Sequence, residues 1–252
     1  MPVVGLTVSC SLLPLGLGSS IVLVFLLEWM APDVIPFQLT TFWTVPDEPG
    51  SAVTGALGLI WPVLVTGLLA TILGVLRTRP LQRKLAQLEP TDGLITLTPY
   101  KLLVNSVLEE VFFRWLIFFA AIATVRFADF IILGFADLHP IRWVFQQALI
   151  PVADLATWHQ LHEVLTGQPW MVGAAMLTSN SRFRKGHFYQ GLFGLVWSWY
   201  LGMFLFLIMF DYGLPLAIAV HLGYNLLIMA VHLALVGTLP RLRIADDRLS
   251  VG

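Results

Sequence analysis

Two acidic residues and one basic residue lie inside a long apolar segment of the sequence. They are Glu109, Glu110 and Arg114. Because Glu110 and Arg114 are four residues apart, a helix would place them on one face, where they can form an ion pair. Glu109 is rotated by about 100° around the same helix, which leaves it the less constrained carboxylate. Such a carboxylate can take a proton from water, so we predict that Glu109 is a general base.

A structural interpretation of these three side chains competes with the functional one. In it, the charged groups only join neighbouring helices through an ion pair. An ionisable group inside a membrane span is costly and usually marks a functional site. Two acids against one base also leave an excess negative charge that a purely structural pair does not need. We therefore favour the functional role of Glu109, supported by Glu110 and Arg114.

Three further polar residues fall in or beside other apolar segments. His221 and Asn225 are four residues apart in the last apolar segment, and His187 opens the one before it. Taken alone, His221 and Asn225 are better explained by a hydrogen bond between membrane helices, and His187 by an interfacial position. Together with Glu109 they supply a carboxylate, two imidazoles and a carboxamide. Hydrolysis by an activated water requires groups of these kinds.

The composition restricts the class of protein. Of the 252 residues, 58% are hydrophobic and 12% are charged, and the charged fraction is about half that of a typical soluble domain. The net charge of −1 argues against a nucleic-acid partner. The single cysteine, Cys10, excludes an intrachain disulfide and a metal site built from cysteines. The sequence therefore predicts an all-α, polytopic bundle of about six to eight membrane helices with a buried polar cavity.

Apolar segments and basic clusters together predict a topology. Membrane spans are expected at residues 5–27, 52–76, 102–125, 188–210 and 214–236. Basic residues cluster in 77–101, in 182–185 and in the C-terminal tail, which places these segments in the cytoplasm. Residues 127–181 must then cross the membrane an odd number of times. One crossing with additional interfacial or re-entrant pieces is the preferred interpretation.

Three short motifs carry a resemblance to a known family. Glu109, Glu110 and Arg114 match EExxxR, Phe183 and His187 match FxxxH, and His221 and Asn225 match HxxxN. In this order the motifs resemble the CPBP family of intramembrane proteases, also called the ABI family, which includes CAAX prenyl endopeptidases. The resemblance covers roughly residues 100–230.

The resemblance implies a role for each matched residue. The first glutamate of EExxxR activates a water molecule, and the second glutamate and the arginine support it. The FxxxH histidine orients that water, and the HxxxN pair forms the oxyanion site. In this chain the roles fall on Glu109, on Glu110 and Arg114, on His187, and on His221 and Asn225, in that order. The family is described both as metalloproteases and as glutamate proteases, so zinc ligation by Glu109, His187 and His221 stays open.

The chain departs from the family pattern between the first two motifs. The gap from Glu109 to His187 is longer than usual for the family, and a second FxxxH, at Phe135 and His139, lies closer. Pro140 directly follows His139 and interrupts a helix there, so His187 is preferred. Residues 127–181 are then an insertion or a rearranged pair of helices. Its polar residues are interpreted as interfacial: Asp129, Asp137, Asp154, His159, His162 and Glu163.

The expected organisation has three parts. Residues 1–100 hold two N-terminal membrane helices and a basic cytoplasmic loop, residues 101–237 hold the catalytic core with its insertion, and residues 238–252 form a basic cytoplasmic tail. The expected function is an endopeptidase of the cell membrane with a cytoplasm-facing site and a protein or peptide substrate, whose prenylation the sequence leaves open. The alternative is a non-enzymatic immunity or membrane-assembly factor on the same scaffold. A transporter is disfavoured because no inverted repeat is visible.

Overall fold

The computed structural model describes residues 35–86, 99–188 and 191–237, together with the isolated residues 22 and 25. Regular structure in these residues is helical throughout, which confirms the predicted all-α class for this part of the chain. The elements are α2 (Pro49–Ala86), α3 (Pro99–Glu109), the π-helix η2 (Glu110–Ile117), α4 (Phe118–Ile131), the 3₁₀ turn η3 (Gly134–Ala136), α5 (Pro140–Val144), the π-helix η4 (Phe145–Leu149), α6 (Ile150–Ala156), α7 (His162–Thr166), α8 (Trp170–Gly186), α9 (Gly191–Tyr212) and α10 (Leu214–Gly237).

Four segments are long and apolar enough to cross a membrane. They are Pro49–Arg77, Tyr100–Ile131, Gly191–Tyr212 and Leu214–Leu235. At about 1.5 Å per residue, even the 22-residue segments exceed the roughly 30 Å hydrocarbon core of a bilayer. These four correspond to predicted spans, as expected of a multi-pass membrane protein. The remaining predicted span, at residues 5–27, lies outside the described residues, as does the tail at 238–252.

The end of α2 differs from the prediction. The helix continues to Ala86, well past residue 76, so the first part of the basic segment 77–101 is helical instead of a loop. The extension includes Pro80, which is unfavourable inside a helix, but residues 81–86 are all strong helix formers. Residues 87–98 lie outside the described residues.

Residues 127–181 contain short helices. Within the described part of the chain, this region holds no helix that meets the length and composition of a membrane span. Its longest element is α8, which has 17 residues and so a length of about 25 Å. Prolines lie at the first turns of α5 and α6, where the missing N–H is tolerated. The described residues therefore contain four long apolar helices, fewer than the six to eight predicted for the whole chain.

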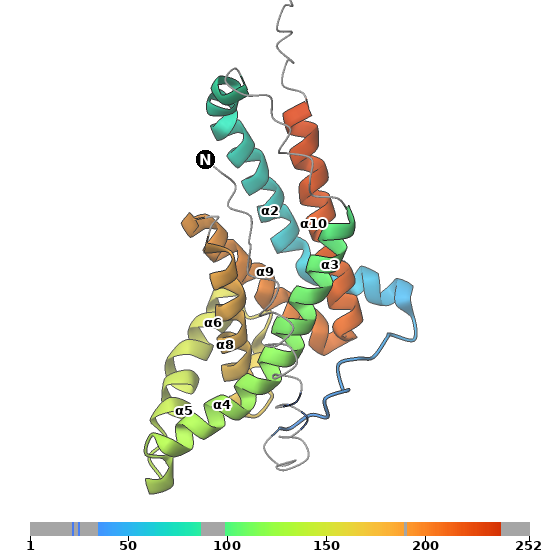
Figure 1. Ribbon diagram of the computed structural model, residues 1–252. Coiled ribbons are helices and arrows are strands. Elements are labelled where there is room, and N and C mark those ends of the chain that lie inside the picture. The colour runs from blue at the N-terminus through green and yellow to red at the C-terminus, as the bar shows by residue number, and fades with distance from the viewer. Residues whose placement is uncertain (1–21, 23–24, 26–34, 87–98, 189–190, 238–252) are drawn as a thin grey trace, which may run out of the picture.

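The α3–η2–α4 rod lies beside α10 and runs in the opposite direction. Ser106 of α3 contacts Asn225, and Glu110 further along the rod contacts His221, one turn earlier in α10. The order of the two contacts reverses between the helices, so they are antiparallel. In Figure 1 the rod crosses the lower part of α10 at an angle, and α2 runs alongside α10.

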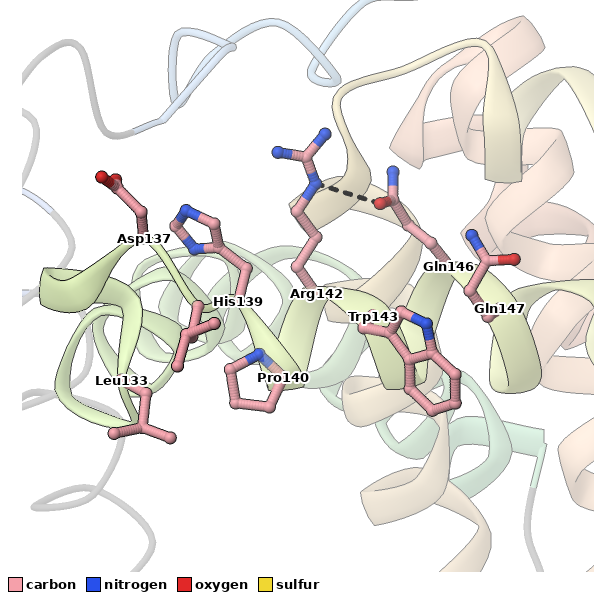
Figure 2. Close-up of a pocket in the computed structure, with 9 residues that line it drawn as sticks. Leu133, Asp137, His139, Pro140, Arg142, Trp143, Gln146 and Gln147 are labelled. Carbon is pink, nitrogen blue, oxygen red and sulfur yellow. Dashed lines mark hydrogen bonds between the residues drawn. The ribbon is translucent and has the colours of Figure 1, made fainter.

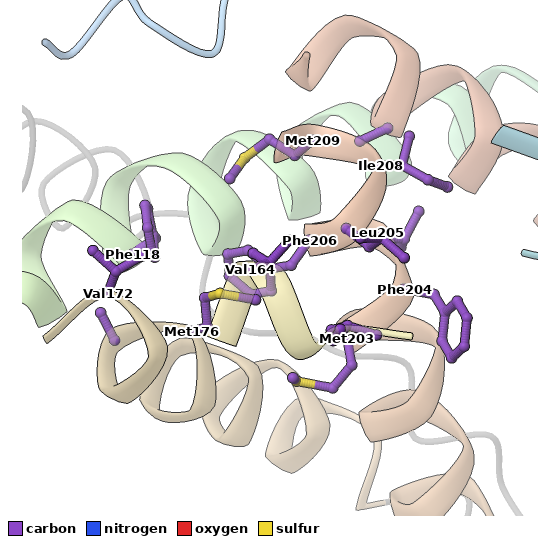
Figure 3. Packing of buried hydrophobic residues seen from close by; sticks show 14 of the residues in the cluster. Phe118, Val164, Val172, Met176, Met203, Phe204, Leu205, Phe206, Ile208 and Met209 are labelled. Atoms are coloured by element: carbon purple, nitrogen blue, oxygen red, sulfur yellow. The ribbon is translucent and has the colours of Figure 1, made fainter. Parts of the chain in front are cut away.

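Helix α8 also runs antiparallel to the rod. Near the C-terminal end of α8, Ser179 donates a hydrogen bond to the Phe113 carbonyl, and the Phe183 ring lies 5.4 Å from the Phe113 ring. The preceding part of α8 packs on α4, where Val172 and Phe118 belong to one hydrophobic core (Figure 3). The chain then reverses again, and Asn180 donates a hydrogen bond to the Trp199 carbonyl of α9 (2.7 Å).

The hydrophobic core is centred on α9. Every residue from Leu201 to Met209 of this helix is buried, on all of its sides. A helix that is apolar all round belongs inside a protein or a membrane. Figure 3 shows Met203, Phe206 and Met209 of α9 among side chains from α4, α7 and α8. The core therefore fixes how α4, α8 and α9 meet, next to the predicted catalytic residues.

Candidate functional site

The EExxxR residues lie where the long rod changes from an α-helix to a π-helix. The sequence predicts a regular α-helix here, but Glu110–Ile117 forms the π-helix η2. A π-helix bonds each N–H to the carbonyl five residues back, and such segments are frequent at functional sites. Glu110 and Arg114 both turn inward from it and are fully buried.

Glu110 and Arg114 form the predicted ion pair. Nη1 of Arg114 lies 3.1 Å from Oε1 of Glu110, although the groups are not aligned as a hydrogen bond. The guanidinium lies over the Phe183 ring, 3.9 Å from its centroid. A cation over an aromatic face is attracted by the ring quadrupole. Phe183, the first residue of FxxxH, thus supports the arginine of EExxxR.

His221 lies between the two glutamates. Its Nδ1 is 2.7 Å from Oε1 of Glu110, and its Nε2 is 3.7 Å from Oε2 of Glu109. We assign a proton to Nδ1 because a carboxylate only accepts hydrogen bonds. That bond holds the ring with Nε2 toward Glu109. The sequence predicted that Glu109 and His221 share a site, but it did not predict that Glu110 orients His221.

The two glutamates differ in their access to the surroundings. The side chain of Glu110 is fully buried, whereas that of Glu109 is 33% exposed. Glu109 is therefore the carboxylate that an entering molecule can reach. The structure agrees here with the expectation that Glu109 is the less constrained of the pair.

Asn225 lies one turn further along α10 and has a partner that was not predicted. Its Nδ2 donates a hydrogen bond to Oγ of Ser106 (3.1 Å), and Ser106 is fully buried. Ser106 precedes Glu109 by three residues, a spacing that places both on neighbouring positions of one helix face. That spacing is the signal by which the sequence could have revealed Ser106.

His187 lies at the edge of this cluster. It follows the last residue of α8, is half-buried, and places Nδ1 3.0 Å from the carbonyl oxygen of Phe183. Its ring lies 4.7 Å from the Phe183 ring, and the His221 ring lies 6.2 Å from the same Phe183 ring. The two motif histidines therefore pack on one phenyl ring, but their contact is indirect.

The second FxxxH histidine belongs to a different part of the molecule. Nδ1 of His139 lies 2.7 Å from Oδ2 of Asp129, whose other oxygen accepts a hydrogen bond from the Arg142 backbone N–H. His139 lines an open cavity of about 640 Å³. Figure 2 shows His139, Asp137 and Arg142 pointing to the same side of this cavity. Asp129, in the last turn of α4, and His139, beyond that helix, thus form a pair of their own.

One set of three metal-ligating side chains is gathered within the described residues, and it is not the predicted one. Asp154, His159 and His162 place one ligand atom each within 4.8 Å of the others. Glu109, His187 and His221 form no such set, so we assign no metal chemistry to them. Burial disfavours ionisation of Asp154, but hydrogen bonds from His162 and His159 outweigh it and lower the pKa of Asp154 below its ordinary value.

Comparison with protein-family models, with curated proteins and with solved structures finds no match to the chain.

Proposed function

We propose that the chain is an intramembrane endopeptidase of the CPBP type, in which Glu109 activates the water that attacks a peptide bond. The observation that carries the proposal is the position of His221, held by Glu110 through Nδ1 and directed at Glu109 through Nε2. A carboxylate and an imidazole that face each other can act on the same water molecule. General bases of this kind contribute about 10²- to 10⁴-fold to a rate.

The charges of the cluster support a division of roles. Glu110 is paired with Arg114 and His221, so its charge is already balanced, whereas Glu109 faces only His221 among these groups. With His221 doubly protonated, two carboxylates, one guanidinium and one imidazolium sum to zero. The Nε2–H of this imidazolium would then stabilise the oxyanion that forms on the substrate carbonyl.

The proposed reaction needs only these groups and water. Glu109 takes a proton as the water oxygen bonds to the carbonyl carbon. The tetrahedral intermediate breaks its carbon–nitrogen bond, and the protonated Glu109 returns the proton to the leaving amine. Asn225 would donate a second hydrogen bond to the oxyanion, and His187 would order the water from the side of Phe183.

Incomplete hydrogen bonding also favours a functional cluster over a purely structural one. Oε2 of Glu110 and Nε and Nη2 of Arg114 are buried without a hydrogen-bond partner among the described residues, and Nη1 of Arg114 has only its ion pair with Glu110. Each such atom costs about 1–3 kcal/mol. A cluster that served only to join helices would be more stable if all of these atoms were hydrogen-bonded. A catalytic role therefore explains the arrangement better.

The remaining features belong to the same proposal. The whole chain would form six to eight membrane helices in the cell membrane, with the site open to the cytoplasm and the lipid bilayer around it. The substrate would be a protein or peptide that reaches Glu109 from the cytoplasmic half. The chemistry of Glu109 and His221 acts on the peptide bond and does not depend on prenylation of the substrate.

Replacement of Glu109 by glutamine tests the proposal. Glu109→Gln keeps the shape of the side chain but removes the base, so cleavage should fall by about 10²-fold or more while the protein stays folded. New protein N-termini would be counted by mass spectrometry in membranes of cells producing equal amounts of each variant. Glu48→Gln, at an exposed carboxylate ahead of α2, is the matched control and should behave as the wild type.

Two outcomes of this comparison separate the candidate functions. Termini that disappear with Glu109→Gln but persist with Glu48→Gln support the protease. If both variants yield the termini of the wild type and fulfil its cellular role, Glu109 is not a catalytic residue, and the non-enzymatic immunity or assembly factor becomes the better interpretation.

A further inference from the structure

The turn between α6 and α7 gathers one carboxylate and two imidazoles. Asp154 lies near the end of α6, and its side chain is 9% exposed. Nδ1 of His159 and Nδ1 of His162 lie 2.8 and 3.0 Å from the same carboxylate oxygen, Oδ2. Oδ1 of Asp154 is buried and has no hydrogen-bond partner among the described residues. This carboxylate thus retains an unused acceptor beside two exposed imidazoles.

The backbone is held in an uncommon conformation to bring these groups together. Trp158 and His159 both have positive φ angles, of 52° and 58°. Residues with a Cβ seldom adopt this left-handed region, and each such position costs about 1–3 kcal/mol. A hydrogen bond of 2.9 Å from the His159 N–H to the Asp154 carbonyl closes the turn. The turn therefore brings the His159 ring to Asp154 even though its backbone conformation is unfavourable for Trp158 and His159.

We propose that Asp154, His159 and His162 bind a divalent transition-metal ion of the zinc class. Two imidazole nitrogens and a carboxylate oxygen are ligands that zinc accepts at bond lengths of about 2.0–2.2 Å. Tetrahedral geometry with such bonds requires about 3.3–3.5 Å between ligand atoms. The two nitrogen–oxygen distances, 2.8 and 3.0 Å, need to open only slightly. Rotation of the two imidazoles, 65% and 59% exposed, provides this movement.

Three protein ligands leave part of the coordination sphere open. Because both histidines face the surroundings, water completes the sphere, as in zinc sites that keep an exchangeable position. The bound ion would also tie the start of α7 to the end of α6. The site shares no residue with the glutamate–histidine cluster, so this inference is independent of the proposed protease function.

Zinc titration of the full chain tests the site. The protein would be purified in detergent without a histidine tag, stripped with a chelator, and titrated with ZnCl₂ by calorimetry. We expect one equivalent to bind to the wild type. His159→Ala and His162→Ala should each weaken this binding by more than the 10- to 100-fold typical of the loss of an outer-shell group. Co²⁺ bound in place of zinc should show visible absorption bands that both variants lose.

Two other histidines supply the controls. His139→Ala removes the histidine of an Asp–His pair for which the described residues supply no third ligand, and His221→Ala removes the histidine of the glutamate cluster; both should bind zinc as the wild type does. Asp154→Asn keeps the volume and one acceptor for the turn but weakens ligation, so it should lose affinity even if an alanine variant misfolds. Unchanged binding in His159→Ala and His162→Ala, or equal loss in His221→Ala, would overturn the proposal.

Discussion

One oxygen atom connects the residues of the cluster. Oε1 of Glu110 is the nearest partner of both Arg114 Nη1 and His221 Nδ1, at 3.1 and 2.7 Å. Glu109, its neighbour in sequence, has one contact within the cluster, at 3.7 Å, and is partly exposed. Adjacent carboxylates thus receive different environments, and different environments are how one residue type comes to perform different tasks.

Loss of the guanidinium should destabilise the protein as well as inactivate it. Arg114→Ala leaves Glu110 buried without its cation, and breaking a buried pair in this way costs about 3–5 kcal/mol. Thermal unfolding in detergent should show a clearly lower midpoint and a lower yield. Arg142→Ala, which removes an exposed arginine bonded to Gln146, is the matched control. Equal midpoints for the two variants would show that the buried pair contributes little.

The two FxxxH histidines should differ in their effect on cleavage. His187 packs on the Phe183 ring, which also contacts Arg114 and His221, whereas His139 is paired with Asp129 at the end of α4. His187→Ala should therefore remove most cleavage, and His139→Ala should leave it intact, in the assay of new N-termini. A loss with His139→Ala alone would mean that the motif assignment is wrong and that the insertion interpretation falls with it.

At the scale of elements, α8, α9 and η2 come close together at Gly202 of α9. A Cβ on Gly202 would collide with Oδ1 of Asn180 and lie 2.8 Å from Nη2 of Arg114. The absence of a side chain thus lets α9 approach both the buried amide of α8 and the guanidinium of η2. Because the core packs tightly on either side, these groups have little room to move away.

Gly202→Ala should therefore disturb the glutamate–histidine cluster, although Gly202 lies far from Arg114 in the sequence. Overpacking of a closely packed site costs about 1–3 kcal/mol, and here the displaced groups are Asn180 and Arg114. We expect a lower unfolding midpoint together with reduced cleavage. Gly58→Ala in α2, where a Cβ meets nothing within 4 Å, should be neutral or slightly stabilising because alanine favours helix. Similar behaviour of the two variants would contradict the close packing at Gly202.

The long apolar elements could be predicted from the sequence, and the local irregularities could not. Some 20 apolar residues in a row are a strong signal, and the four described spans follow it. The π-helix at Glu110 has no such signal, because the same residues fit an α-helix equally well. The turn at Asp154 depends on left-handed backbone at Trp158 and His159, a conformation that is uncommon for any residue with a Cβ and that the sequence does not predict at either position. The grouping of Asp154, His159 and His162 was therefore missed.

At the scale of the whole molecule, the contacts indicate the relative direction of the long helices that the structure describes. Gly55 of α2 faces Tyr212, at the end of α9 just before α10 begins, and Gly67 faces Tyr224 of α10, so α2 is parallel to α10. The α3–α4 rod is antiparallel to α10 and to α8, and α9 reverses once more. Once the side of the membrane is known for one end of one of these helices, the sides of the other helix ends follow.

Cysteine labelling supplies that assignment. The basic residues near 77–101 and 182–185 predict that Tyr100 and Gly186 lie in the cytoplasm, and the rod then predicts that Ala136, just beyond α4, lies on the opposite side. These three positions are exposed, so Tyr100→Cys, Ala136→Cys and Gly186→Cys in a Cys10→Ser background suit a membrane-impermeant maleimide. In intact cells the maleimide should label only Ala136→Cys, whereas in permeabilised cells it should label all three variants. If Ala136→Cys and Gly186→Cys label from one side, the chain between them crosses the bilayer an even number of times or not at all. In that case the odd number of crossings predicted for 127–181 is wrong. Label on Tyr100→Cys in intact cells would instead invert the whole protein and turn Glu109 toward the outside.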